Sequence, residues 1–467
     1  MNTNNGLPLV VPRITPVLDP KFRPAALACH AFRERLGSGV SRLPVKIALE
    51  QADGSIYHYA TEIFKPGHAL VGQNYAYVER LVKFLLWSRG GCRIYFTGPK
   101  ALAEKLQQHF RETPTGKFDS NLIGERVYER AIEVVVVDEA ALPPEHSNAQ
   151  PLGRHLKGCR IGFDLGGSDR KVAAVKNGKV EFSLETVWDP YFRPDPQYHI
   201  DGIMDSLKRA AAHLPRVDAI GGSAAGVYVN SRVMVSSLFR GVPQEVFDKR
   251  VKNLFLDLQK QWGVPMEVVN DGEVTALAGS MAINKNSVLG VAMGTSQAAG
   301  YVTPEGNITT WLNELAFAPV DYNPEAPVDE WSGDYGVGAQ YFSQQAVARL
   351  LPAAGIDVNP EMPLPDQLKQ LQKLMDNDDY RARKVYETLG AYLGYGLAHY
   401  ADFYDFKTVL ILGRVTSGPG GNVMIDVAKE VLRVEFPDLV KRINFHVPDE
   451  TEKRHGQAVA AASLPKI

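Results

Sequence analysis

The hydrophobic positions of the chain recur with two different periods, and each period predicts one kind of element. Short apolar runs bounded by turn residues are typical of buried strands, and we predict such strands at Cys92–Phe96, Ile132–Val137, Val217–Ile220, Met266–Val269 and Ser287–Met293. Apolar residues at helical spacing predict helices at Tyr75–Ser88, Lys100–Phe110, Tyr198–Leu214, Phe247–Gln261 and Leu389–Phe403. Because strands and helices alternate, the chain is predicted to be an α/β protein.

The first part of the chain forms a unit of its own in this pattern. Closely spaced prolines in Met1–Pro24 predict an extended arm. The turn Ala52-Asp53-Gly54 joins the strands Val45–Glu50 and Ser55–Phe64 into a hairpin. Before the linker-like segment Pro143–Lys157 we find neither a chemistry-bearing cluster nor the helix–turn–helix pattern of DNA-binding modules. Residues 1–157 are therefore predicted to be an accessory α/β domain.

Composition narrows the class of protein. The chain has 467 residues, and its 51 Lys+Arg against 53 Asp+Glu give a net charge of −2, which supplies no electrostatic footprint for nucleic acid or an anionic membrane. Cys29, Cys92 and Cys159 are far apart, which argues against a zinc site or a disulfide framework and fits a reducing cytosol. The sequence has no signal-peptide pattern and no apolar run of membrane-spanning length. These features predict a cytoplasmic protein that acts on a small molecule.

The stretch Cys159–Ala174 carries the first candidate chemistry. An apolar strand holds one acid, Asp164, and leads into a glycine turn with a hydroxyl, Gly166-Gly167-Ser168, before a second strand. A carboxylate at the end of a buried strand, beside a turn too small to block an approaching backbone, suits a metal-bound phosphate. The turn Asn177-Gly178 predicts that the second strand folds back on a third, Val180–Thr186. A plain hairpin without a ligand is the alternative.

A second acid follows the strand Met266–Val269. Asn270-Asp271-Gly272 is itself a favoured tight-turn sequence, so a simple hairpin is one interpretation. The apolar residues that follow have helical spacing instead, at Val274, Leu277, Ala278 and Met281. A strand, an aspartate and then a helix place Asp271 at the carboxyl end of a strand, where open α/β sheets bind their ligands.

A second glycine turn, Gly294-Thr295-Ser296, separates the strands Ser287–Met293 and Ala298–Thr303. Gly294 allows close backbone approach, while Thr295 and Ser296 offer hydroxyl and amide donors to anionic oxygens. Two such turns and two acids at strand ends are what in-line phosphoryl transfer requires. That reaction depends on positioning and charge neutralisation, with one carboxylate accepting the proton of the attacking hydroxyl.

Four blocks, in this order, make the chain from about residue 160 onward resemble the ROK family of sugar kinases and sugar-responsive regulators, within the hexokinase/actin-type ATPase superfamily. G-F-D-L-G-G-S resembles the first phosphate motif, with Ser168 where threonine is usual. V-V-N-D-G-E-V-T-A-L-A-G resembles the block that carries the catalytic aspartate and a sugar-binding asparagine, here Asp271 and Asn270. G-V-A-M-G-T-S-Q-A-A-G-Y-V resembles the second phosphate motif, of whose later glycines only Gly300 is present. V-L-I-L-G-R-V-T-S-G resembles the adenosine block, with Gly413.

The chain departs from the family on the sugar side. N-E-L-A-F stands where the family has G-E-I-G-H, so the sugar-binding glutamate is kept as Glu314 and the histidine is replaced by Phe317. The segment Trp331–Ser343 contains none of the cysteines of the family's zinc loop, and the second sugar-binding glutamate aligns with Ala339. Arg414 replaces the second glycine of the adenosine block. The phosphate-handling residues therefore match well and the sugar-selecting residues match poorly.

The resemblance implies a two-lobed, ribonuclease H-like core of the actin/hexokinase type, with lobes at 158–284 and 285–467 that follow the N-terminal α/β domain. It further implies ATP- and Mg²⁺-dependent phosphorylation of a hydroxyl of a sugar or sugar derivative. Asp271 would be the general base, Asp164 would hold magnesium, and Asn270 and Glu314 would bind the sugar. The phosphate and nucleotide contacts would come from Gly166, Gly167, Ser168, Gly294, Thr295, Ser296 and Gly413. The expected partner is a small-molecule sugar, with a homodimer as a further option because family members commonly dimerise.

Two other interpretations are carried alongside this one. A catalytically idle sugar- or nucleotide-binding regulatory protein on the same fold is favoured by the poorly matching sugar side and by Arg414, and is disfavoured by retention of both acids. An iron–sulfur ATPase activator of the same superfamily is disfavoured by three isolated cysteines.

Overall fold

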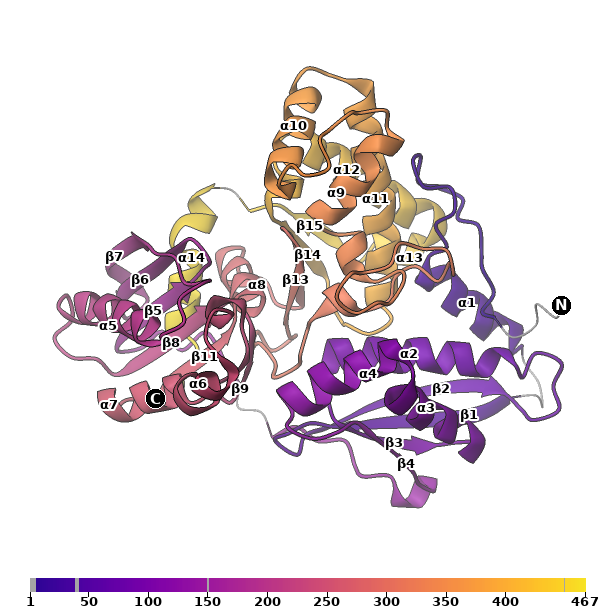
Figure 1. Ribbon diagram of the computed structural model, residues 1–467, viewed down its shortest axis with the longest axis horizontal. Coiled ribbons are helices and arrows are strands. Elements are labelled where there is room, and N and C mark those ends of the chain that lie inside the picture. The colour runs from indigo at the N-terminus through magenta and orange to yellow at the C-terminus, as the bar shows by residue number, and fades with distance from the viewer. Residues whose placement is uncertain (1–5, 38–41, 149–150, 449) are drawn as a thin grey trace.

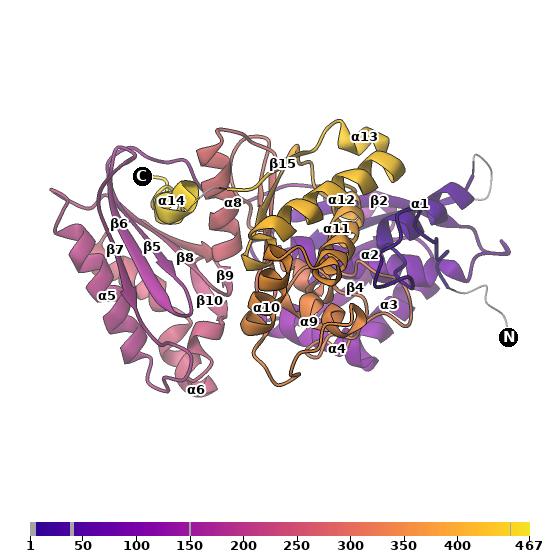
Figure 2. The same ribbon diagram turned by 90° about the horizontal axis from the view of Figure 1, so that it is seen from above.

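The computed structural model describes residues 6–37, 42–148, 151–448 and 450–467, and these form three parts, each built on its own main sheet (Figure 1). Two lobes lie side by side, and the N-terminal domain packs against the second lobe and reaches the first (Figures 1 and 2). This arrangement confirms the predicted α/β class and the two-lobed core. Within the described residues, no helix is long and apolar enough to cross a membrane.

The N-terminal domain has a four-stranded sheet in the order β2-β1-β3-β4. The predicted hairpin is present as β1 paired with β2, and β4 runs parallel to β3. The strand predicted as buried at Ile132–Val137 is instead a partly exposed edge strand, because only β3 pairs with it. The elements are α1 (Ala25–Arg35), β1 (Arg42–Glu50), β2 (Ile56–Phe64), α2 (Gln73–Arg89), β3 (Arg93–Thr97), α3 (Lys100–Glu112), α4 (Pro114–Asp119) and β4 (Glu133–Val136).

The first lobe has a five-stranded sheet in the order β11-β8-β5-β6-β7. Strands β11, β8 and β5 are parallel, so their carboxyl ends share one edge. Alternate residues of β6 serve the two faces: Val172 and Ala174 pack into the core with α5 and α7, and Ala173 and Val175 pack against α14. The elements are β5 (Cys159–Leu165), β6 (Asp169–Lys176), β7 (Lys179–Val187), α5 (Gln197–Ala211), β8 (Ala219–Ala224), β9 (Val227–Val229), β10 (Arg232–Val235), α7 (Leu254–Trp262) and β11 (Met266–Asn270).

The strand predicted at Val217–Ile220 extends further than expected, because β8 runs from Ala219 through Gly221 and Gly222 to Ala224. The C-terminal helix α14 (Glu450–Ala462) lies directly on the backbone of this part of the sheet. A Cβ atom on Gly221 would lie 1.7 Å from the carbonyl oxygen of Ala461, and one on Gly162 would lie 1.7 Å from that of Ala458. The glycines are therefore strand residues that admit a closely packed helix.

Two helices lie between the lobes. Helix α8 (Asp271–Ala282) follows β11 and packs against β12 and β13 of the second lobe, and α14 packs against α8 and the sheet of the first lobe. By packing, α14 therefore belongs with the first lobe, although the predicted division placed it in 285–467. A small core holds this layer together: its buried members include Val274, Ala276, Leu277, Val288, Val302, Leu410 and Ala460.

The second lobe has a four-stranded sheet in the order β13-β12-β14-β15, in which β12 and β14 are parallel. The predicted helix Leu389–Phe403 falls, up to Tyr400, within a longer one, α11, in which Gly390 and Gly394 lie against α12. The elements are β12 (Val288–Met293), β13 (Gln297–Val302), α9 (Gln344–Ala353), α10 (Leu364–Asp376), α11 (Tyr380–Tyr400), β14 (Thr408–Leu412), α12 (Pro419–Glu435), α13 (Pro437–Val440) and β15 (Asn444–His446).

One predicted helix is interrupted. The predicted helix Phe247–Gln261 begins instead with a π-helical turn at Phe247–Val251, which follows the short helix α6 (Gln244–Val246). The regular helix α7 starts only at Leu254. The carbonyl of Lys252 accepts a hydrogen bond from the backbone of Val233 at 2.9 Å instead of continuing a helical ladder. A contact between distant residues thus breaks the element that the local pattern predicted.

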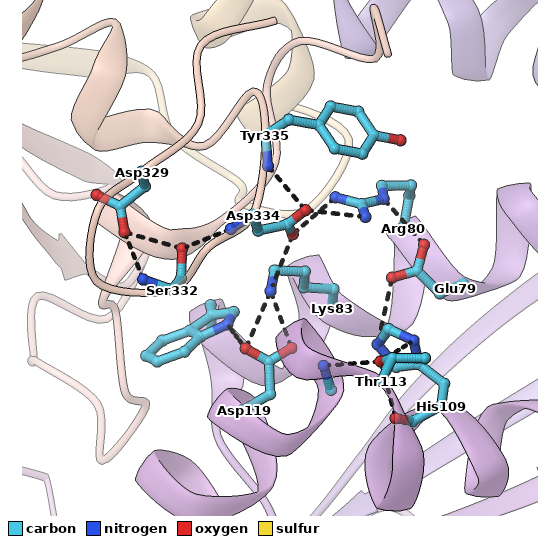
Figure 3. Close-up of polar contacts among 12 residues, drawn as sticks. Glu79, Arg80, Lys83, His109, Thr113, Asp119, Asp329, Ser332, Asp334 and Tyr335 are labelled. Carbon is cyan, nitrogen blue, oxygen red and sulfur yellow. Dashed lines mark hydrogen bonds and ion pairs between the residues drawn. The ribbon is translucent and has the colours of Figure 1, made fainter. Parts of the chain in front are cut away.

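The N-terminal domain is fixed to the second lobe by a shared hydrophobic core and by a buried ion network (Figure 3). Lys83 Nζ lies 2.9 Å from Asp119 Oδ2 and 3.0 Å from Asp334 Oδ2. Arg80 donates two hydrogen bonds to Asp334, at 2.8 and 3.2 Å, and a third to Glu79. The side chains of these five residues are all less than 10% exposed, so the charges are paired away from water.

Candidate functional site

Asp164 and Asp271 lie at the same edge of the first lobe's sheet. Asp164 is near the end of β5 and Asp271 directly follows β11, with β8 between them. Ser223 of β8 is the cross-strand neighbour of Asp164, and its hydroxyl donates a hydrogen bond to Asp164 Oδ1 at 2.6 Å. The same hydroxyl oxygen accepts from Gln457 of α14 at 3.2 Å. The predicted hairpin alternative for Asp271 is excluded, since a helix follows it.

Asp271 is the first residue of α8, and Asn270 caps that helix. Asn270 Oδ1 accepts from the backbone of Gly272 at 2.7 Å, and its Nδ2 donates to the carbonyl of Gly226 at 2.7 Å. One amide proton of Asn270 remains for another partner. A Cβ on Gly272 would lie 2.6 Å from the carbonyl oxygen of Ala299 in β13, so the start of α8 is pressed against the second lobe. Asp271 therefore lies where the two lobes meet.

The charge of Asp271 acts on two other predicted site carboxyls, Asp164 and Glu314. Burial raises the pKa of Asp271. Burial, and then the charge of Asp271, raise the pKa of Asp164 to about 6, against the hydrogen bond from Ser223 that lowers it. Burial and Asp271 likewise raise the pKa of Glu314 to about 7. Neighbouring carboxyls with raised pKa values are typical of sites that bind a cation or move a proton.

A fourth carboxyl, Glu273, was not predicted. Burial raises its pKa to about 8, and the Glu314 charge also raises it, although it accepts hydrogen bonds from the Asn313 side chain and the Tyr301 backbone. Burial thus favours the protonated, uncharged form of Glu273 near neutral pH. Its signal in the sequence was a glutamate directly beside Val274, on the buried side of the predicted helix.

The glycine positions of the second lobe lie together. Gly294 and Gly413 follow the neighbouring parallel strands β12 and β14. Gly413 has φ 95°, and a Cβ on it would lie 2.3 Å from the carbonyl oxygen of Met293, so only glycine fits there. Thr295 and Ser296 are exposed at the tip of the turn. The backbone N–H of Gly294 donates a hydrogen bond to the carbonyl of Ser296 at 3.0 Å and closes the turn. Arg414 is exposed as well.

The first glycine turn belongs to the other lobe. Gly166 and Gly167 are half-buried and Ser168 is exposed, with its hydroxyl donating to Asp169 at 2.8 Å. A Cβ on Gly167 would lie 1.7 Å from the hydroxyl oxygen of Tyr191, so this glycine, too, is required by packing. Among the described residues, no hydrogen bond joins this turn to Gly294–Ser296.

The N-terminal domain holds the backbone of Glu314 in place, and the sequence did not predict this contact. The last carbonyls of a helix have no partner within it. At the end of α2, the carbonyls of Trp87 and Ser88 accept from the backbones of Glu314 and Asn313, each at 3.0 Å, and that of Arg89 accepts from Leu312 at 3.4 Å. The segment that carries the predicted sugar ligand is thus held by the end of a helix from another domain.

Residues that differ from the ROK motif pattern also lie near the N-terminal domain. Phe317, at the position of the family histidine, packs on Trp87 with ring centroids 4.6 Å apart. Asp334, inside the segment that replaces the zinc loop, binds Arg80 and Lys83. Ala339 and Gln340 are buried, whereas Trp331 is 79% exposed. The residues that differ from the family pattern therefore include the ones that contact the N-terminal domain.

Within the part of the chain that the structure describes, no three His, Cys, Asp or Glu side chains gather closely enough to hold a metal ion by themselves. Asp164 is nevertheless a buried carboxyl (6% exposed) whose hydrogen-bond partner is a neutral hydroxyl. This donor set fits a cation whose remaining ligands come from a bound phosphate and water.

No family model matches the sequence, and no curated protein matches it. Among solved structures, the chain is similar to a ROK hexokinase from Thermus thermophilus, with 18% identity over 65% of this chain and 96% of that one and a TM-score of 0.51. It is also similar to a ROK family transcriptional regulator, a homologue of the E. coli MLC protein, with 17% identity over 66% and 78% and a TM-score of 0.54. About two-thirds of the chain therefore has the fold of ROK-family sugar kinases and regulators, as the sequence motifs predicted.

Proposed function

We propose that this protein transfers the terminal phosphoryl group of ATP to a hydroxyl of a sugar or sugar derivative. The observation that carries the proposal is the pair Asp164 and Asp271 at the carboxyl ends of β5 and β11, at one edge of the sheet and close enough for the charge of Asp271 to raise the pKa of Asp164. Open α/β sheets bind ligands at this edge. The fold is one that sugar kinases use.

Asp271 is assigned as the general base. It begins α8, at the junction of the lobes, and its pKa is raised by burial, which brings a carboxylate closer to the basicity that proton transfer near neutral pH requires. Asn270 is fixed beside it by two hydrogen bonds, and Glu314 is fixed by the end of α2. These two side chains would orient the acceptor hydroxyl toward the Asp271 carboxylate.

The nucleotide side is assigned to the two glycine turns and Asp164. Backbone N–H groups and hydroxyls of Gly166–Ser168 and Gly294–Ser296 would bind phosphate oxygens, with Gly413 under the adenosine and Asp164 holding Mg²⁺. ATP would supply the transferable phosphoryl group, and Mg²⁺ would supply the positive charge that this cluster of carboxyls lacks. In this arrangement Asp164 stays deprotonated and oriented by the Ser223 hydroxyl.

A catalytically idle, sugar- or nucleotide-binding regulator is the second candidate. Phe317 and Ala339 stand where the ROK motifs have a histidine and a sugar-binding glutamate. The ring of Phe317 packs on Trp87 instead. The fold is shared with a transcriptional regulator as well as with a hexokinase. Retention of Asp271 argues for the kinase, because a binding protein does not need a base.

The decisive variant is Asp271→Asn, since an amide oxygen can still accept the hydrogen bond from the Gly272 backbone that Asp271 Oδ1 accepts at 3.0 Å. We expect turnover with ATP to fall by about 10²–10⁴-fold while nucleotide affinity by calorimetry is kept. Asp257→Asn, an exposed acid on α7, is the matched control and should behave like the wild type.

The pH dependence provides a second test. Turnover of the wild type should rise with pH as Asp271 loses its proton, and this acid limb should disappear from the residual activity of Asp271→Asn. Undiminished turnover in Asp271→Asn would contradict the assigned role. Sugar or nucleotide binding with no turnover across a panel of sugars would favour the regulator instead.

A further inference from the structure

A cavity lies beside Asn270, where the N-terminal domain meets both lobes. Asp53 and Tyr128 contribute from the N-terminal domain, Asn230 and Glu267 from the first lobe, and Trp311 from the second. Since Asn270 lines the cavity and Asp271 follows it in the chain, the cavity borders the position proposed for the acceptor hydroxyl.

The cavity lies between two separately packed bodies. The N-terminal domain and the second lobe share one hydrophobic core, whereas the first lobe has a core of its own. On the first-lobe side the N-terminal domain also makes ion pairs from Glu129, whose side chain is 42% exposed, to Arg232 at 2.8 Å and to Lys252. A ligand in the cavity would touch both bodies and so favour the lobe arrangement in which it fits.

The chemistry of the walls selects against anions. No Lys, Arg or His lines the cavity, but the carboxyl groups of Asp53 and Glu267 do. Glu267 hydrogen-bonds to the Ser231 hydroxyl at 3.0 Å, and none of the described cations forms an ion pair with it. Arg89 stacks on Trp311 at 3.6 Å, but it is 1% exposed and does not itself line the cavity. A phosphate or carboxylate placed here would meet uncompensated acids.

The walls instead suit a polyhydroxylated group. Carboxylate oxygens of Asp53 and Glu267 accept hydrogen bonds, the side chains of Asn230 and Thr310 can donate and accept, and the rings of Tyr228 and Tyr128 add apolar surface. Small-molecule sites commonly combine a few polar groups with aromatic walls, and they occur preferentially between domains.

We propose that this cavity binds a second, uncharged sugar unit of the acceptor, so that the preferred substrate is a disaccharide or glycoside whose other unit presents its hydroxyl to Asp271. The inference rests on the proposed function, because it extends the acceptor site of that reaction. It also gives the N-terminal domain a direct part in substrate selection, through the turn Gln51–Asp53 and Tyr128.

The probes are glucose, mannose and N-acetylglucosamine and, for comparison, maltose, cellobiose and N,N′-diacetylchitobiose. We expect at least one disaccharide to have a kcat/KM at least about tenfold above that of its own monosaccharide, the factor that corresponds to about 1.4 kcal/mol of binding. If every disaccharide is equal to or poorer than its monosaccharide, the inference is overturned.

The matched variants place a large side chain on exposed alanines of the N-terminal domain. Ala52→Trp fills the cavity from the hairpin turn. Ala101→Trp, the control, adds the same side chain to an exposed position of α3 that does not line the cavity. We expect the disaccharide-to-monosaccharide ratio of kcat/KM to fall about tenfold in Ala52→Trp and to keep its wild-type value in Ala101→Trp. An unchanged ratio in Ala52→Trp overturns the inference.

Calorimetric titration of Asp271→Asn protein with the same sugars separates the two proposals. If a disaccharide binds, Ala52→Trp weakens its binding, and the wild type phosphorylates neither monosaccharides nor disaccharides, the proposed kinase is refuted and the cavity is supported. Monosaccharide turnover without disaccharide binding would refute the cavity and leave the kinase standing. Absence of binding by any disaccharide overturns the inference whatever the turnover.

Discussion

The two sides of the candidate site are supported in different ways. On the phosphate side, Asp164 and Gly413 occupy strand ends of the two lobe sheets, and Ser223 of the neighbouring strand orients Asp164. On the substrate side, Glu314 and Asp334 belong to irregular segments that the N-terminal domain holds through α2 and the buried ion network. The proposed phosphate side is therefore built by the fold itself, and the proposed substrate side is built by an additional domain.

This difference explains where the sequence departs from the family. Phe317 and Asp334 both contact the N-terminal domain, through Trp87 and Lys83. A segment supported by another domain does not need a zinc site to order it, because contacts with that domain, here the ion pairs of Asp334 with Arg80 and Lys83, can supply the order. The comparison predicts that damage to the ion network alters stability and sugar binding, whereas damage near Asp164 alters nucleotide binding.

The largest effect is expected for Lys83→Met. Removing this cation leaves Asp119 and Asp334 in a buried site with less positive charge, and breaking a buried pair in this way typically costs about 3–5 kcal/mol. The free energy of unfolding, measured by urea titration, should fall by this amount, and sugar affinity should weaken more than nucleotide affinity.

Lys21→Met is the matched control for that variant. Lys21 pairs with Glu325 of the second lobe at 2.7 Å, but both side chains are about 70% exposed, so the free energy of unfolding should stay at its wild-type value. If Lys83→Met were as stable as Lys21→Met, the ion network would not be what fixes the substrate side.

A smaller effect is expected from acid. Burial alone would raise the pKa of Asp334, but Lys83 and Arg80 together lower it to about 2, below the ordinary value of 3.8. Stability from this group is therefore complete above about pH 4 and is lost as pH falls toward 2. Between about pH 5 and pH 3 the wild type should lose about 1 kcal/mol more than Asp334→Asn.

The control for this pH experiment, which compares urea midpoints, is an acid that is not buried in an ion network. Asp438→Asn serves, because Asp438 is 95% exposed beside Lys441. The free energy of unfolding of Asp438→Asn should depend on pH in the same way as that of the wild type. Equal acid sensitivity in the wild type and Asp334→Asn would show that the Asp334 carboxylate does not stabilise the interface.

The phosphate side was predictable from sequence because its features are local. An apolar strand followed by Asp164 and a glycine turn, and a strand followed by Asp271 and a helical pattern, lie within short stretches of chain, and both were found as predicted. Parallel pairing through β8 then brings the two strand ends to one edge. The order of the blocks along the chain was enough to predict the fold.

The substrate side was not predictable because its contacts join distant parts of the chain. Nothing near Glu314 indicates that the end of α2 binds its backbone, and nothing near Asp334 indicates Lys83. The continuation of β8 beyond Ile220 was missed for the same reason, since the helix that its glycines admit is at the other end of the sequence. Local patterns predict elements, and they do not predict which distant element will supply a partner.

The smallest effect is expected on the phosphate side, for Ser223→Ala. The Ser223 hydroxyl lowers the pKa of Asp164, which burial and Asp271 raise to about 6, so its removal should raise that pKa further. Mg²⁺–nucleotide affinity, measured by calorimetry, should then fall a few-fold near pH 6, by about 1 kcal/mol or less, and recover at higher pH as Asp164 ionises. Gln457→Ala removes only the other hydrogen bond of the same hydroxyl and should shift this pH dependence less. Sugar affinity should be unchanged in both variants, and a larger loss for sugar than for nucleotide would contradict the separation of the two sides.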